Sequence, residues 1–379
     1  MSKNINIIQD RITKYKELIN ERASNLMGYP ESGYFDYAPL RDFMDYNIDN
    51  LGDPYSDLLY GVNSCEFEKE VISYFSNMYD LKDNESWGYV TSSGTEGNLY
   101  GLFLGRELHQ EAILYYSADA HYSIAKAGRL LRIPMQVIPS LTNGEIDYEA
   151  LHHAIDLNPG KPAIVVATLG TTFTGAIDNV DKIAAIFEEN NRTDFYIHCD
   201  AALSGMMLPF MKEMGAPQIS FDKPIGSVSV SGHKFIGAPY PCGIVVARKE
   251  HVERIQTAIE YIGALDSTIG GSRNGQAPLY LWYAIESRGH DKGFEKEVTT
   301  SLKMADYLCE RLGSIGYPYD RNQFSNTVTF KEPAEDIVRK WQLARVRGKA
   351  HIITVPHANK QKIDAFISDL EASARSDAI

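Results

Sequence analysis

The sequence predicts an α/β fold, with a mostly parallel central sheet followed by a small C-terminal α+β domain. From about residue 87 to residue 248, short apolar runs alternate with segments of helical periodicity, joined by short loops. This alternation is typical of parallel strands covered by helices on both faces. From Phe294 onward, three helical segments alternate with two strand-like ones. We therefore expect an N-terminal arm (1–48), a large domain (49–288) and a small C-terminal domain (289–379).

The N-terminal part of the chain is predicted to be helical at both ends and irregular between. Apolar residues recur at Ile8, Ile12 and Tyr15, which is a helical spacing and predicts a helix over residues 5 to 25. A second amphipathic helix is predicted from Glu66 to Tyr79. The aromatic segment 34–62 is interrupted by Gly-Asp-Pro and is expected to be rich in loops.

The strands of the large domain are predicted from their apolar runs. Ala163 to Leu169 is continuously apolar up to its last residues, as in a parallel strand buried on both faces. Ile225 to Val230 instead alternates small polar and β-branched residues, so its two faces differ. The other expected strands are 87–91, 113–116, 136–139, 195–200 and 243–248, and the expected helices between them end near Leu108, cover 119–131 and 147–157, or follow Asp178.

The remaining segments are predicted from periodicity and glycine content. Residues 253 to 261 have a helical spacing, and the glycine-rich segment 263 to 275 is expected to be a mobile loop. A long helix is expected to start within 278 to 288. The small domain is predicted to contain a helix from Phe294 to Leu312, strands at 326–331 and 351–355, and helices at 333–345 and 360–375.

Composition narrows the class of protein. A net charge of −13 argues against a nucleic-acid partner, because neutralising phosphates requires clustered Lys and Arg. The four cysteines are widely spaced, so they indicate neither a metal site nor a disulfide framework. The N-terminus lacks a signal-peptide pattern, and no apolar run is long enough to span a membrane. These features predict a soluble cytoplasmic protein.

Lys234 is the first candidate functional residue. It follows the 225–230 strand behind Gly232 and beside His233, at the carboxyl edge where open α/β sheets bind ligands. A desolvated lysine amine becomes nucleophilic and forms Schiff bases with carbonyl compounds such as pyridoxal phosphate (PLP). The alternative is that Lys234 is a solvated loop lysine.

Three further segments lie at carboxyl ends of predicted strands. Ser93, Gly94 and Thr95 precede a helix, whose N-terminus favours a phosphate, although a plain helix cap has the same composition. His121 lies at another strand-to-helix junction, where it stacks on a planar ring or simply caps the helix. Asp200 ends an apolar strand, where it pairs with a pyridinium N–H or caps a loop.

Together these four segments supply what a PLP ring requires. They offer a phosphate site, a stacking group, a carboxylate for the ring nitrogen and a lysine for the aldehyde, all at one edge of one sheet. Their order and spacing along the chain resemble those of the type I PLP-dependent fold, that of aspartate aminotransferase, which is the fold we expect.

The chain resembles the group II PLP-dependent amino-acid decarboxylases from Gly28 to the final helix. Within that family it is most similar to the short branch that holds bacterial histidine decarboxylase and plant-type serine decarboxylase. The motifs that carry the resemblance are Thr95-Glu-Gly-Asn, His121-Tyr-Ser, Gly170-Thr-Thr, His198-Cys-Asp-Ala-Ala, Ser231-Gly-His-Lys and Gly271-Ser-Arg-Asn-Gly.

The resemblance implies a role for each matching residue. It implies that Lys234 forms the Schiff base with PLP, that His121 stacks on the ring and that Asp200 pairs with the ring nitrogen. It places Ala202 beneath the ring and Thr172 near its 3′-oxygen. The residues implied to hold the phosphate are Ser93, Gly94, Thr95, Ser231 and His233.

The resemblance also raises expectations about the substrate and the assembly. The acid that reprotonates Cα is expected to be Tyr261, His121 or Lys234. His357 stands where some larger relatives have a carboxylate-binding arginine, so it is a candidate for substrate contact. The family is dimeric with an N-terminal arm on the partner, a role that residues 1 to 48 can fill, and the assembly is a homodimer or a dimer of dimers. No metal is implied.

The implied reaction is loss of CO2 from an L-amino acid, a carboxy-lyase reaction. Asn50-Leu-Gly-Asp-Pro, Tyr60-Gly-Val and Lys340-Trp-Gln-Leu-Ala are similar to the serine-specific relatives, whereas 200–207 and 351–357 are similar to the histidine-specific ones. We expect L-serine to give ethanolamine, with L-histidine giving histamine as the alternative. An aminotransferase of the same fold and a non-catalytic binding protein are the rivals from other classes.

Overall fold

The computed structural model describes residues 2–33, 35–57, 59–259, 264–289 and 292–376. By spatial contact the chain divides into two units. Unit 1 comprises residues 1–30, 301–321 and 326–379, and unit 2 comprises residues 31–300 and 322–325. The three regions expected from the sequence (1–48, 49–288 and 289–379) stay a prediction about folding domains.

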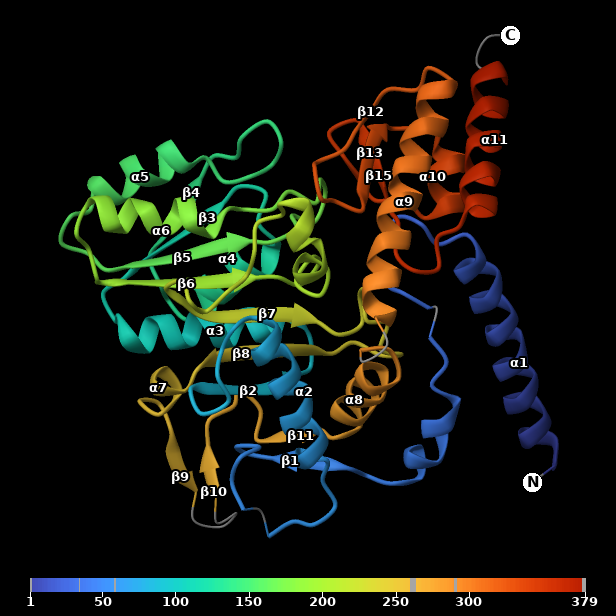
Figure 1. Ribbon diagram of the computed structural model, residues 1–379. Coiled ribbons are helices and arrows are strands. Elements are labelled where there is room, and N and C mark those ends of the chain that lie inside the picture. The colour runs from blue at the N-terminus through green and yellow to red at the C-terminus, as the bar shows by residue number, and fades with distance from the viewer. Residues whose placement is uncertain (1, 34, 58, 260–263, 290–291, 377–379) are drawn as a thin grey trace. The chain divides into compact units, whose positions relative to one another are not determined.

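A seven-stranded sheet forms the centre of unit 2, in the order β2-β8-β7-β6-β5-β3-β4. The strands from β4 to β7 are parallel, and β8 runs antiparallel to both β7 and β2. In Figure 1 the arrows of β5, β6 and β7 point the same way. The predicted mostly parallel sheet is thus confirmed. Its strands are β2 (Ser86–Thr91), β3 (Ile113–Ser117), β4 (Met135–Ile138), β5 (Ala163–Thr168), β6 (Phe195–Asp200), β7 (Ile225–Ser231) and β8 (Gly243–Arg248).

Helices connect and cover these strands. Helix α3 packs against β6, β7 and β8, while α2 packs against β2, β8 and α8. The bounds are α2 (Cys65–Met78), α3 (Gly94–Leu108), α4 (Tyr122–Leu130), α5 (Tyr148–Asp156), α6 (Val180–Glu189), α7 (Lys249–Val252) and α8 (Gln276–Arg288), with short 3-10 helices η1 (Ala38–Asp45) and η2 (Leu208–Met214). Helix α9 (Gly293–Ser314) begins in unit 2, and its residues from 301 onward belong to unit 1.

The serines of β7 explain why α3 lies so close to the sheet. Ser227, Ser229 and Ser231 alternate with valines, so all three face the same side of the strand. A Cβ added to Gly97 would lie 2.2 Å from Ser229 Oγ, and one added to Gly101 would lie 2.2 Å from His198 Nδ1. Glycine in α3 and serine in β7 therefore allow close contact between helix and sheet.

Two predictions for residues 253 to 275 were wrong. The segment predicted as a helix from 253 to 261 contains strand β9 (Thr257–Ile259), which pairs antiparallel with β10 (Ala264–Asp266). The segment predicted as a mobile loop contains β10 and β11 (Ser272–Asn274), and β11 pairs with β1 (Asp49–Leu51). Pairing between strands decided the structure of these short segments, whose own periodicity is ambiguous.

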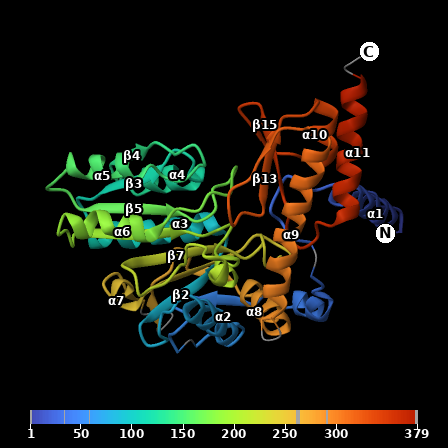
Figure 2. The same cartoon turned by 45° about the horizontal axis from the view of Figure 1, so that its top comes forward.

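Unit 1 is built on a four-stranded antiparallel sheet in the order β12-β13-β15-β14. Figure 2 shows β13 and β15 beside α10 and α11. The apolar core between them includes Phe330, Trp341 and Phe366, together with Met27. The elements are α1 (Ser2–Ser24), β12 (Tyr319–Asp320), β13 (Thr327–Lys331), α10 (Glu335–Trp341), β14 (Arg345–Val346), β15 (Lys349–Ile353) and α11 (Lys360–Ser376).

Candidate active site

Lys234 lies in the turn that follows β7. Burial lowers the pKa of its amine below the usual value, and the carboxylates of Asp200 and Glu31 oppose part of this shift. Loss of hydration favours the neutral form of a lysine, which is the nucleophilic form. Gly232 precedes it, and a Cβ there would lie 2.7 Å from Cys242 Sγ. The turn is therefore tightly packed around a lysine of raised reactivity.

Asp200 is the last residue of β6 and is only 3% exposed. Its carboxylate accepts hydrogen bonds from Asn98 Nδ2 at 2.9 Å and from the Ala202 N–H at 3.2 Å. Among the residues that the structure describes, no cation forms an ion pair with it. A buried carboxylate of this kind is suited to receive a cationic group.

His121 caps the N-terminus of α4. Its Nδ1 accepts the Ser123 N–H at 3.3 Å and lies 2.8 Å from Ser123 Oγ. Burial lowers its pKa, Asp200 opposes the shift, and Lys234 and Lys126 add to it. Burial thus favours the neutral imidazole, and the charges of Asp200 and Lys234 both act on it. The structure thus brings His121, Asp200 and Lys234 together, from three different elements.

Residues predicted to hold a phosphate at the start of α3 and the end of β7 lie close together, next to Ala202, which was predicted to lie beneath the ring. Ser93 is the N-cap of α3, and its side chain accepts the Glu96 N–H at 3.4 Å. A Cβ on Gly94 would lie 2.6 Å from Ser231 Oγ and 3.4 Å from Ala202 Cβ. Gly94, Ser231 and Ala202 are therefore neighbours at the positive end of the α3 dipole, beside Thr95 in its first turn.

His233 is held by the backbone of Cys242, the residue that directly precedes β8. Its Nδ1 lies 2.9 Å from the Cys242 carbonyl oxygen and 3.3 Å from the Cys242 N–H. Burial lowers its pKa, and Lys234 also lowers it.

Comparison with known proteins shows which family the chain belongs to. Residues 66–316 match the pyridoxal-dependent decarboxylase conserved domain. The chain is 45% identical to serine decarboxylase 1 of Oryza sativa subsp. japonica, over 94% of this chain and 74% of the relative. The chain belongs to the pyridoxal-dependent decarboxylase family.

Two further comparisons show which other decarboxylases this chain is similar to. It is 46% identical to a histidine decarboxylase of Vibrio campbellii, over 91% of this chain and 89% of the relative. A solved L-methionine decarboxylase of Streptomyces superposes with a TM-score of 0.88 at 26% identity, over 94% of both chains. The protein is a PLP-dependent amino-acid decarboxylase of the group that contains the serine and histidine enzymes, with the type I PLP fold predicted from its sequence.

The residues described above fit PLP. Asp200 is a buried carboxylate without an ion-paired cation among the described residues, as a pyridinium nitrogen requires. Gly94 leaves open a space that a Cβ would fill against Ser231. Lys234 supplies an amine whose pKa is lowered by burial. The site thus offers groups of the right chemistry for the ring nitrogen, the phosphate and the aldehyde.

Three predicted site residues are not brought into this cluster. Thr172 lies exposed in the turn after β5 and has no role that the structure tests. Tyr261 lies outside the described residues. His357 lies in unit 1, where its Nε2 donates to the Leu26 carbonyl at 3.2 Å. Their roles stay predictions.

Sequence reasoning missed three polar residues in contact with the site. Asn98, Ser123 and His198 each occur in a motif named above, but none of them was assigned a role from the sequence. Asn98 and Ser123 are buried and hydrogen-bonded to each other at 3.0 Å. The two-residue period of β6 places His198 on the same face as Asp200, which is the one signal that could have found it.

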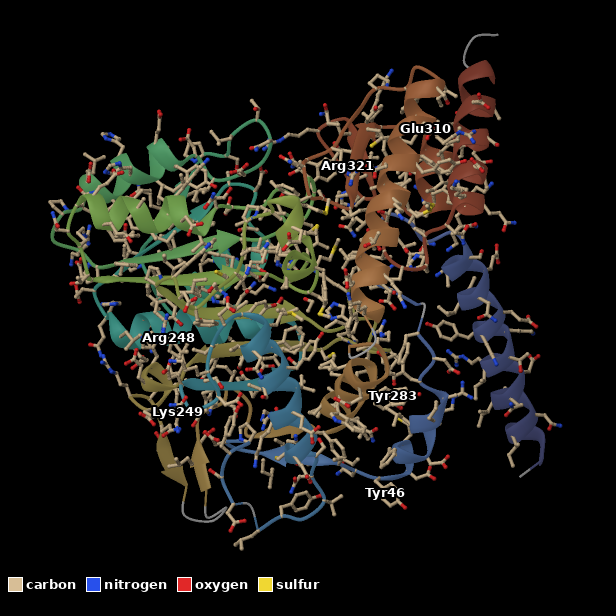
Figure 3. All side chains as sticks on the ribbon, viewed as in Figure 1. Tyr46, Arg248, Lys249, Tyr283, Glu310 and Arg321 are labelled. Atoms are coloured by element: carbon tan, nitrogen blue, oxygen red, sulfur yellow. The ribbon has the colours of Figure 1, made fainter. Side chains whose placement is uncertain are left out.

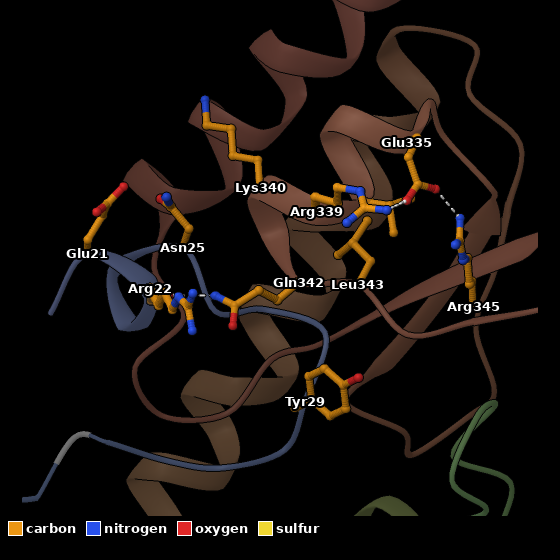
Figure 4. A pocket seen from close by; sticks show the side chains of 11 residues that line it. Glu21, Arg22, Asn25, Tyr29, Glu335, Arg339, Lys340, Gln342, Leu343 and Arg345 are labelled. Atoms are coloured by element: carbon orange, nitrogen blue, oxygen red, sulfur yellow. Dashed lines mark hydrogen bonds and ion pairs between the residues drawn. The ribbon is translucent and has the colours of Figure 1, made fainter. Parts of the chain in front are cut away.

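Unit 1 contains a pocket of about 720 Å³ with a charged lining (Figure 4). Arg339 and Arg345 both pair with Glu335 there, and Lys340 pairs with Asp369. These three cations already have carboxylate partners, so they do not form a ready anion site. The described residues also contain no group of three or more side chains suited to hold a metal ion. Nor does any described helix have the length and apolarity needed for a membrane span.

Proposed function

We propose that this decarboxylase converts L-serine to ethanolamine and CO2. The observation that carries the proposed site is the cluster of Lys234, Asp200 and His121, in which the Asp200 carboxylate raises the pKa of both Lys234 and His121 against the lowering effect of burial. When bound, PLP supplies the electron sink that receives the electrons left as CO2 departs from Cα. The side chains of this cluster hold that group and orient the substrate on it.

Each residue then has a defined task. Lys234 would supply the neutral amine that bonds the cofactor aldehyde, and the Asp200 carboxylate would hold the proton on the ring nitrogen. His121 and Ala202 would hold the two faces of the ring. Ser93, Gly94, Thr95, Ser231 and His233 would hold the phosphate, and Thr172 would contact the 3′-oxygen. We assign the proton delivered to Cα to Tyr261, His121 or Lys234, and substrate carboxylate contact to His357.

The serine assignment is supported by resemblance within the family. Three serine decarboxylases of Oryza sativa subsp. japonica are 43% to 45% identical to this chain. L-Histidine, with histamine as product, is the second candidate, because histidine decarboxylases of Vibrio campbellii and Acinetobacter baumannii are 46% and 44% identical.

The substrate is tested by supplying the holoenzyme with single L-amino acids. We expect CO2 release and ethanolamine with L-serine, and a lower kcat/KM with L-histidine. A higher kcat/KM with L-histidine, and histamine as its product, would overturn the serine assignment. Incubation with pyruvate or 2-oxoglutarate tests for an aminotransferase, which would convert bound PLP to the pyridoxamine form.

The role of Lys234 is tested by Lys234→Ala. This variant is expected to lose both decarboxylation and the visible absorbance of the bound cofactor, because it lacks the amine proposed to bond the aldehyde. Lys249→Ala, at the β8–α7 junction (Figure 3), is the matched control and should retain both. Retention of the visible band in Lys234→Ala would disprove the role.

We further propose a homodimer in the cytoplasm. Helix α1 carries exposed apolar side chains that would be unfavourable in water, among them Ile8 at 58%, Ile12 at 55% and Tyr15 at 63% exposure. A second copy of the chain is the partner expected for this face. All four cysteines are free, which is compatible with a reducing compartment.

A further inference from the structure

A continuous chain of hydrogen bonds runs between α3 and the sheet of unit 2. It begins at Tyr196, whose hydroxyl donates to Ser227 Oγ at 2.8 Å, and Ser227 Oγ lies 2.8 Å from His198 Nδ1. His198 Nε2 lies 3.0 Å from Asn98 Oδ1. Asn98 Nδ2 then donates to Asp200 at 2.9 Å and to Ser123 Oγ at 3.0 Å.

The chain ends on two residues of the proposed active site. Asp200 is one end. Ser123 Oγ lies 2.8 Å from Nδ1 of His121, which is the other. One carboxamide therefore connects the acid proposed for the ring nitrogen with the imidazole proposed for the ring face.

The donors and acceptors of this chain permit a single arrangement. Asn98 must present its NH2 group to Asp200, because a carboxylate only accepts, so its carbonyl oxygen faces His198. His198 Nε2 must then carry the proton. Its Nδ1 accepts from the Ser227 hydroxyl, which in turn accepts from Tyr196. Reversing the Asn98 amide would set oxygen against oxygen at Asp200 and N–H against N–H at His198.

Burial makes this arrangement rigid. His198 is 0% exposed and Asn98 is 1% exposed. Burial lowers the pKa of His198 to about 4, so the ring is neutral. The titratable groups that face the chain are Asp200, His121 and, through His121, Lys234 and Lys126. Because Asn98 is neutral, it orients the Asp200 carboxylate without cancelling its charge.

We propose that Asn98 is a positioning residue that fixes the Asp200 carboxylate for the cofactor ring nitrogen and, through Ser123, the imidazole of His121. His198 holds Asn98 in the required orientation. This inference deepens the proposed function and rests on the roles assigned there to Asp200 and His121.

The test compares Asn98→Asp and Asn98→Ala with the wild-type holoenzyme. Each protein is reconstituted with PLP labelled with ¹⁵N in the ring, and the ¹⁵N chemical shift reports whether the nitrogen is protonated. Asn98→Asp keeps the shape but sets a second carboxylate against Asp200, so the two share a proton and the ring nitrogen loses its full counter-charge. We expect its signal to move toward the unprotonated value.

Binding and kinetics provide the second readout. Loss of one hydrogen bond to a charged group predicts PLP binding and kcat that are each weaker by about 10- to 100-fold in Asn98→Ala. KM for the amino acid should stay within about threefold of wild type, since Asn98 does not contact substrate.

Two controls separate positioning from general loss of structure. Asn326→Ala removes another buried asparagine, one that donates to Thr354 O in unit 1, and should change none of these readouts. Ser123→Ala keeps the Asn98–Asp200 bond, so it should leave the ring nitrogen protonated while lowering kcat through His121.

The outcomes distinguish this inference from the proposed function. An unprotonated ring nitrogen in the wild-type protein would disprove the role of Asp200, and with it the basis of the inference. A protonated nitrogen in the wild type that stays protonated in both Asn98 variants, with unchanged PLP affinity, would overturn the positioning role of Asn98 alone.

Discussion

His198 and Asp178 are buried side chains whose pKa values move in opposite directions for the same physical reason. Burial lowers the pKa of His198 from 6.5 to about 4 and raises that of Asp178 from 3.8 to about 7, because loss of hydration disfavours the charged form of each side chain. Asp178 also accepts the N–H groups of Ile146 and Thr168, both at 2.7 Å. Their effects on stability therefore have opposite pH dependences.

For His198, stability is lost as the pH falls. Between pH 6.5 and about 4 the unfolded chain binds a proton that the folded chain does not. The wild-type free energy of unfolding should drop by up to about 3 kcal/mol across this window on account of His198. His198→Gln lacks the titration, so its urea unfolding curves should depend less on pH. Equal pH slopes in the two proteins would contradict the assignment.

For Asp178, stability is lost as the pH rises. The unfolded chain releases its proton above pH 3.8, whereas the folded chain retains it until about pH 7. The cost approaches about 4 kcal/mol at neutral pH. Asp178→Asn removes this dependence, so the difference in unfolding free energy between wild type and variant should change between pH 4 and 7. Urea titrations at several pH values measure it, and a constant difference would be inconsistent with the raised pKa.

At the scale of secondary-structure elements, a buried ion pair joins α2 to β11. Arg273 pairs with Glu68, which also accepts from Asn50 Nδ2 and from the Val90 N–H, both at 2.7 Å. Arg273 in addition donates to Gly52 O at 3.0 Å. The network thus connects α2, β1, β2 and β11 in the interior of unit 2.

Removing one partner of this pair should be costly. Arg273→Met leaves the buried Glu68 carboxylate without its cation, which predicts a loss of about 3 to 5 kcal/mol in the free energy of unfolding. Arg339→Met breaks the exposed Arg339–Glu335 pair on α10 and should cost less than about 1 kcal/mol. Chemical denaturation compares the two. Similar losses of unfolding free energy in the two variants would show that the buried pair contributes no more to stability than the exposed one.

The elements that could be predicted from the sequence are those with strong local patterns. The continuous apolar run at β5 and the serine–valine alternation at β7 define buried and two-faced strands by themselves. The β9–β10 hairpin could not be predicted, because its three-residue strands are set by pairing with each other. Local periodicity over so few residues does not distinguish a helix from a strand.

The same contrast applies to the candidate site. Lys234, Asp200 and His121 could be proposed because each follows a recognisable strand, and ligands bind at that edge of such sheets. The partners of Asp200 could not be proposed, because Asn98 lies on a helix 102 positions away in the chain. Contacts of that kind depend on how α3 packs on the sheet.

At the scale of the whole molecule, the apolar face of α1 should determine the oligomeric state. Ile12→Lys adds one positive charge within this face and should shift the protein from dimer to monomer in analytical ultracentrifugation, with loss of activity. Glu17→Gln, which changes the net charge by the same amount on the same helix, should leave the dimer intact. A monomeric wild-type protein, or a dimer unaffected by Ile12→Lys, would refute the proposed interface.

The contact of Gly94 with Ser231 has a consequence for biosynthesis. The helix that begins at Gly94 is synthesised long before the strand that ends at Ser231, yet the two must be side by side before a phosphate has its site. A nascent chain released before Lys234 has emerged from the ribosome would therefore lack the amine proposed to bond the vitamin-derived cofactor. If Lys234 bonds the cofactor as proposed, loading has to follow translation of at least residues 1 to 234 of the 379.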